Sequence, residues 1–159
     1  MLFWASIGYF RGWGKVQNNE EAGAGEAIGF TLDQQIFVER GDIASHVESA
    51  PILTNVFRGN IFWFSDKPLG VGDTLKMKLA SAEHMVTVQS VDEVIDTENL
   101  GGTGRNEVLR SEVAKVTLRA RGMMALDEAT SSPLTGRVVL VDDFRIVGGG
   151  TLSVVGYRN

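Results

Sequence analysis

In residues 112–121, EVAKVTLRAR, apolar and polar side chains alternate from Ala114 to Arg121. Successive side chains of a β-strand point to opposite faces, so this pattern predicts a strand with one buried and one solvated face. The expected inward side chains are Ala114, Val116, Leu118 and Ala120. The expected outward ones are Lys115, Thr117, Arg119 and Arg121. Such one-sided burial is typical of antiparallel sheets.

Similar segments lie on both sides of this stretch. Strands are predicted at Asn55–Phe64, Asp73–Leu79, His84–Asp96, Arg137–Val141 and Ile146–Val155. Turn-forming residues separate these strands, and no stretch between them has apolar residues at the helical period. Near Ser90 the apolar residues shift from one strand face to the other, which predicts a bulge there. Strands joined by turns rather than by crossover helices predict an all-β fold, an antiparallel β-barrel.

The N-terminal third is organised differently. Strands are predicted at Ala27–Leu32 and Asp42–Ser45. A domain boundary is predicted near Val47–Pro51, because proline removes a ladder donor and keeps its predecessor extended. We therefore expect two parts, residues 1–47 as a partial second barrel and residues 48–159 as the complete one. The glycine- and threonine-containing stretch Glu98–Asn106 is predicted to be a loop.

Composition limits the possible functions. The 159-residue chain is long enough for one domain, or for a small barrel plus part of another, and it contains no cysteine. Disulfides and thiolate metal sites are thereby excluded, which fits a cytoplasmic protein. The net charge of −5 disfavours phosphate backbones as partners. The apolar start, MLFWASIGYF, has no basic residues before it and is too short to cross a membrane, so no membrane partner is expected.

Motifs for chemistry are nearly absent. Gly8 and Gly14 are separated by five residues where a P-loop has four, and Val16 stands where a magnesium-binding Ser or Thr is needed. His46 and Glu48 share one face of a possible strand but lack a third metal ligand. The acidic neighbours, such as Asp92 and Glu93, would point to opposite faces of a strand. We predict no catalytic, cofactor-binding or metal-binding residues.

One surface feature could bind a partner. The outward cations of the strand at 112–121 form a basic row, which outward lysines of the strand at 73–79 could join. The predicted contact residues are Lys115, Arg119, Arg121, Lys76 and Lys78. The row could bind an acidic patch of a partner or an RNA phosphate, but Glu107 and Glu112 flank it, which favours an ordinary solvated strand face. No aromatic side chains interleave with the row, which weakens the RNA interpretation further.

Two stretches carry a family resemblance. Residues 22–43, AGAGEAIGFTLDQQIFVERGDI, resemble the end of the second domain of translation elongation GTPases. Residues 135–150, TGRVVLVDDFRIVGGG, resemble the closing hairpin of the third domain, the C-terminal barrel of the elongation factor Tu type. Within this group, the amino-acid sequences of the first stretch and of SVDEVID at 90–96 are similar to those of the large subunit of bacterial sulfate adenylyltransferase, which is often fused to an adenylylsulfate kinase.

The resemblance implies a role rather than a catalytic site. In that family the large subunit couples GTP hydrolysis to transfer of AMP from ATP to sulfate on the small subunit. GTP and magnesium belong to a GTPase domain whose P-loop, D-x-x-G and N-K-x-D motifs are not found here. We therefore expect a non-catalytic barrel whose partners are the GTPase domain of the same polypeptide and the small subunit, with no kinase activity of its own.

Two alternatives stay open. The barrel could bind tRNA, as in a true elongation factor, although the acidic charge argues against it. It could also be an unrelated β-module that binds a small ligand, which the sequence neither supports nor excludes.

Overall fold

The computed structural model describes residues 5–8, 23, 29–32, 36–46, 48, 50–95, 102, 104–131 and 133–154. The chain divides into two compact units, Met1–Glu39 and Arg40–Asn159. In the first unit, β1 (Ala5–Gly8) pairs antiparallel with β2 (Gly29–Leu32), from Ala5 opposite Leu32 to Gly8 opposite Gly29. The partial second barrel, and its boundary with the complete one at residues 47–48, stay predictions.

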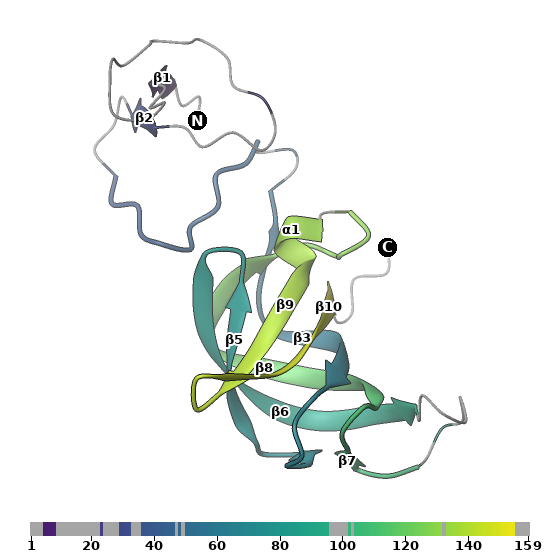
Figure 1. The fold of residues 1–159 in the computed structure, drawn as a ribbon. Helices are drawn as coiled ribbons and strands as arrows, with labels where there is room; N and C mark the ends of the chain where they lie inside the picture. The colour runs from purple at the N-terminus through teal and green to yellow at the C-terminus, as the bar shows by residue number, and fades with distance from the viewer. Residues whose placement is uncertain are drawn as a thin grey trace. The chain divides into compact units, whose positions relative to one another are not determined.

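The second unit is built on a closed antiparallel barrel, seen in Figure 1, with the strand order β10-β3-β8-β6-β5-β9. Its strands are β3 (Ile52–Trp63), β5 (Thr74–Leu79), β6 (Ala82–Ile95), β8 (Val113–Leu126), β9 (Arg137–Asp142) and β10 (Arg145–Val154). The short strands β4 (Leu69–Gly70) and β7 (Glu107–Val108) pair with each other, and one helical turn, α1 (Pro133–Gly136), precedes β9. The predicted all-β antiparallel barrel is confirmed.

Alternation places the core inside the barrel. On β8 the predicted inward side chains of Ala114, Val116, Leu118 and Ala120 are all buried, and β5 buries Leu75, Met77 and Leu79 in the same way. Neighbouring strands add Phe57, Ile61, Val86, Val88, Leu140 and Leu152. Because a barrel has no free edges, each strand satisfies its backbone on both sides while its apolar face leaves water.

Bulges bend the long strands around this core. The register of β6 against β8 shifts between Val88 and Ser90 and again between Val91 and Glu93. The bulge predicted near Ser90 is therefore confirmed. A further shift in β3 lies between Thr54 and Val56, where the Val56 N–H donates to Thr54 Oγ1 at 3.1 Å. Bulges of this kind increase the local twist that barrel closure requires.

The glycines of β10 allow two strands to approach closely. A Cβ atom on Gly148 would lie 2.9 Å from the Trp63 ring, and one on Gly150 would collide with the backbone carbonyl of Asn60. Both contacts are made with β3, the neighbour that closes the barrel. Glycine is needed here because β10 and β3 pack backbone against backbone.

One predicted strand is wrong. Residues 42–46 form no strand, and Ala44, Ser45 and His46 are exposed. A turn at Arg40–Gly41 precedes them, with Gly41 at φ 106°. The Arg40 side chain donates from Nε to the Ser81 carbonyl at 2.9 Å, so the segment is held by a side chain and not by a ladder. Most of the predicted loop at 98–106 lies outside the described residues.

Candidate docking surface

The five predicted contact residues lie on the outer face of neighbouring strands. Lys76 and Lys78 are on β5, and Lys115, Arg119 and Arg121 are on β8, with β6 between the two strands. Register connects them across the sheet: Thr87 of β6 lies opposite both Thr74 of β5 and Arg119 of β8. The structure thus brings the cations onto one curved face in two groups; their role in partner binding stays a prediction.

A single carboxylate serves both lysines of β5. Glu83 lies opposite Lys78 in the β5–β6 ladder, and its oxygens are 3.1 Å from Lys78 Nζ and 3.2 Å from Lys76 Nζ. Hydrogen bonds from Lys78 and Lys76, together with their positive charge, lower the pKa of Glu83. These side chains remain about half exposed, so the arrangement organises charge on the surface rather than stabilising the fold strongly.

Two of the cations of β8, Lys115 and Arg119, also have partners. Lys115 Nζ is 2.5 Å from Glu93 Oε2, and Thr117 donates to Asp92 at 2.9 Å. Arg119 Nε donates to the side-chain oxygen of Gln89 at 2.5 Å when the Gln89 amide is placed in its hydrogen-bonding orientation. The expectation that Asp92 and Glu93 point to opposite faces is wrong, because the bulge between Val91 and Glu93 leaves both exposed.

Glu112 does not flank the basic row as predicted. Its carboxylate is buried, ion-paired with Arg105, and accepts the Leu109 N–H at 2.7 Å. Its backbone carbonyl accepts the Trp63 N–H at 3.0 Å. Because a buried carboxylate is stable only when its lone pairs are satisfied, Glu112 fixes the segment that leads into β8.

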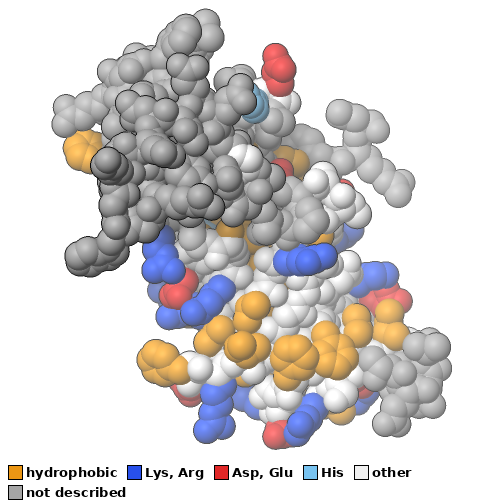
Figure 2. Space-filling view, turned by 45° about the horizontal axis from the view of Figure 1, so that its top comes forward, with side chains coloured by type: hydrophobic (Ala, Val, Ile, Leu, Met, Phe, Trp, Pro, Cys, Tyr) orange, Lys and Arg blue, Asp and Glu red, His pale blue; other side chains and the backbone are white. Residues whose placement is uncertain are grey.

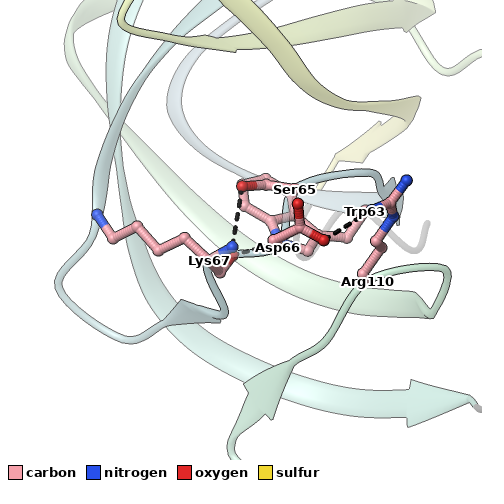
Figure 3. A network of polar contacts seen from close by, with 5 residues as sticks. All are labelled: Trp63, Ser65, Asp66, Lys67 and Arg110. Atoms are coloured by element: carbon pink, nitrogen blue, oxygen red, sulfur yellow. Dashed lines mark hydrogen bonds and ion pairs between the residues drawn. The ribbon is translucent and has the colours of Figure 1, made fainter.

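A second polar cluster, shown in Figure 3, ties the turn after β3 to the segment before β8. Trp63 Nε1 donates to the Lys67 carbonyl at 2.8 Å, and the Lys67 N–H donates to Ser65 Oγ at 3.1 Å. Arg110 reaches Asp66 at 2.7 Å. The buried indole thus finds its hydrogen-bond acceptor within the turn, which indicates a structural role for this cluster.

An apolar groove lies beside the lysines of β5. Its volume is about 550 Å³, and it is lined by Thr74, Lys76, Lys78, Met85, Val139, Val141, Asp142, Asp143, Phe144 and Ile146. Figure 2 shows hydrophobic side chains gathered in a band across one face of the barrel, with Lys and Arg on both sides. This surface was not predicted from the sequence, where its signal is Phe144, a large aromatic residue within a turn.

The described ranges show no metal centre. Within them, no group of three or more His, Asp or Glu side chains could hold a metal ion. His46 and Glu48 are exposed in a segment that forms no sheet, so the strand face that they were expected to share does not exist. Nor does any helix in the described part of the chain have the length and apolar character of a membrane span.

The closed antiparallel barrel is a fold that this chain shares with the C-terminal domains of translation-factor GTPases. Residues 56–153 match the family model described as "GTP-eEF1A C-terminal domain-like", and the chain belongs to this family. A solved structure of Sup35 in complex with GDP superposes with a TM-score of 0.83 over 97% of this chain and 38% of that one, at 12% identity, which shows the shared fold.

Relatives found by sequence include sulfate adenylyltransferase subunits. The chain is 28% identical over 127 residues to sulfate adenylyltransferase subunit 1 of Shewanella oneidensis, covering 77% of this chain and 26% of the relative. It is 28% identical over 134 residues to the bifunctional enzyme NodQ of Azospirillum brasilense, covering 83% of this chain and 22% of the relative. The chain therefore spans about a quarter of the length of these relatives.

Proposed function

We propose that this chain is a non-catalytic docking barrel of a sulfate adenylyltransferase large subunit. The observation that carries the proposal is where the polar and apolar side chains lie. The barrel interior is apolar, and the side chains that could contact a partner lie on the outer face of β5, β6, β8 and β9. An exposed apolar groove edged by charged side chains, as between β5 and β9, is typical of a surface that contacts another protein. The relatives named subunit 1 support this assignment, since that name implies a further subunit.

We assign the remaining parts of the activity to the rest of the large subunit and to the small subunit. GTP and magnesium would bind a GTPase domain of the same polypeptide, and AMP transfer to sulfate would take place on the small subunit. A parent fused to an adenylylsulfate kinase remains part of the proposal that rests on the family resemblance, and one relative is named a bifunctional enzyme. The proposed location is the cytoplasm, where ATP and GTP are available.

Binding and turnover together test the proposal. The purified chain is titrated with the sulfate adenylyltransferase small subunit of the same organism by isothermal calorimetry, and GTP and ATP hydrolysis are followed in parallel. We expect saturable binding and no turnover by the chain alone. Turnover that disappears when a residue of this chain is mutated, or the absence of any binding, would refute the proposal.

A tRNA-binding barrel is tested by filter binding of aminoacyl-tRNA over a salt series, because phosphate contacts make affinity fall steeply with salt. The ion pairs of Lys76, Lys78 and Lys115 with acidic neighbours argue against this outcome. We expect no retention of tRNA at 150 mM salt.

A further inference from the structure

The turn between β9 and β10 has a conformation that one of its residues, Phe144, disfavours. Asp142 and Arg145 face each other across a two-residue loop, and the loop residues Asp143 and Phe144 have φ values of 43° and 66°. Two-residue hairpins with positive φ at both positions favour Asn-Gly or Asp-Gly, and a bulky aromatic residue there is an outlier. Glycine at 144 would serve the hairpin better than phenylalanine.

The phenylalanine gains nothing from the barrel in return. The Phe144 side chain is 99% exposed, the largest exposure among the large hydrophobic residues of the described ranges. A side chain that costs backbone strain and stays in water does not contribute to folding. Strained, exposed positions of this kind point to a contact made outside the domain.

Register gives Phe144 an apolar surrounding. Ile146, which is 64% exposed, lies opposite Val141, and Val141 lies opposite Lys76 on β5. One row further along, Val139 lies opposite Lys78 on one side and Gly149 on the other. The groove beside Phe144 is thus floored by branched apolar side chains and edged by the two lysines.

Charges at the two ends of the groove are of opposite sign. Lys76 and Lys78 share the single carboxylate of Glu83, so two positive charges face one negative charge at that edge. Asp142 and Asp143 line the hairpin end. The aspartates disfavour a lipid headgroup or a nucleic-acid phosphate, whereas a protein surface can present an apolar pocket and separate charges that match both ends.

We infer that the β9–β10 hairpin is the anchor by which the barrel docks on the small subunit of sulfate adenylyltransferase. Phe144 enters an apolar pocket of that partner, and an acidic side chain of the partner joins Lys76 and Lys78. This inference rests on the proposed function. Exposed aromatic residues that become fully desolvated are the residues that dominate binding energy at protein interfaces.

Phe144→Gly separates binding from folding, because glycine relieves the positive φ while removing the aromatic ring. Calorimetric titration with the small subunit is expected to show at least about a tenfold loss of affinity. The thermal midpoint of the free variant should equal or exceed that of the parent chain. Phe144→Trp should keep affinity within about threefold, since it keeps an aromatic anchor.

Leu53→Ala is the matched control, because Leu53 is 66% exposed on β3 and does not line the groove. We expect it to bind like the parent chain. If the parent chain binds and Phe144→Gly binds equally well, or if Leu53→Ala weakens binding as much, the hairpin anchor is refuted and the docking function stands. If the parent chain does not bind at all, the proposed function fails and the anchor with it.

A second copy of the chain is the competing occupant. Sedimentation velocity of the chain alone is expected to give a monomer. A dimer that Phe144→Gly dissolves would show that the hairpin binds another copy, and it would overturn the assignment to the small subunit.

Discussion

β8 and the β9–β10 hairpin belong to the same barrel but present opposite chemistry to solvent. On β8, Lys115 pairs with Glu93 and Arg119 with Gln89, so these two outward cations have partners within the barrel. The hairpin instead exposes Phe144 and Ile146, which have no comparable cover among the described residues. A charged row that is already paired gains little from a partner, whereas exposed apolar surface gains free energy on leaving water.

The largest expected effect tests whether this difference is confined to the outer faces. Leu118 on β8 and Leu140 on β9 are both fully buried. Replacing either by alanine removes buried methyl groups and leaves a cavity, at a cost of about 2–5 kcal/mol in the free energy of unfolding. Urea denaturation of both variants measures it. If the losses of unfolding free energy for the two variants differ by more than about 3 kcal/mol, the width of this range, the inner faces of β8 and β9 also differ.

The inner faces are also where the sequence was most informative. Alternation at 73–79 and 112–121 predicted the buried side chains of β5 and β8, and the slip near Ser90 predicted a bulge in β6. These are local patterns, since strand pleating alone decides which side chains share a face.

The outer face was less predictable because its partners are remote in sequence. Lys76, Lys78 and Glu83 meet only through the β5–β6 ladder, and Lys115 meets Glu93 only because β6 lies beside β8. Glu112 looked like a surface charge, yet tertiary contacts with Arg105 and Leu109 bury it. The groove depends on the pairing of β5 with β9, which places Lys76 opposite Val141. Because these residues are far apart in the sequence, no local pattern predicts the groove.

The next effect concerns the strain that distinguishes the hairpin. Phe144→Gly should raise the free energy of unfolding by about 1 kcal/mol, because a left-handed conformation is unfavourable for a residue with a Cβ atom. Phe144→Ala keeps the Cβ atom and should leave stability within about 0.5 kcal/mol. Urea denaturation of the two variants measures the difference. Equal stability of glycine and alanine at this position would mean that the turn is not strained.

A smaller effect is expected from the cations of β8. Reversing the charges of Arg119 and Arg121 together should weaken small-subunit binding by only a few-fold, because exposed ion pairs contribute about 0.2–1 kcal/mol. The remaining effect should shrink when salt is raised to 0.5 M. Titrations at two salt concentrations measure it. A loss larger than that of Phe144→Gly would reverse the comparison and make the basic row the main contact; no change at all would remove these two arginines from the interface.

The smallest expected effect lies at the edge between the two regions. Hydrogen bonds from Lys78 and Lys76 lower the pKa of Glu83 below its ordinary value of 4.5 in the folded chain. A carboxyl group whose pKa falls on folding stabilises the folded state above its unfolded pKa, and this contribution is lost as the pH falls through the folded pKa. Glu83→Gln should therefore be slightly less stable than the parent chain at pH 7. The two should converge only when the pH has fallen below the lowered pKa that Glu83 has in the folded chain, since the carboxyl is then protonated in both the folded and the unfolded state. Urea denaturation at a series of pH values, with NMR titration of the Glu83 carboxyl carbon, follows both quantities. A difference that persists unchanged into acid would show that Glu83 acts through packing rather than through its charge, and the lysine edge of the groove would then lack its electrostatic organisation.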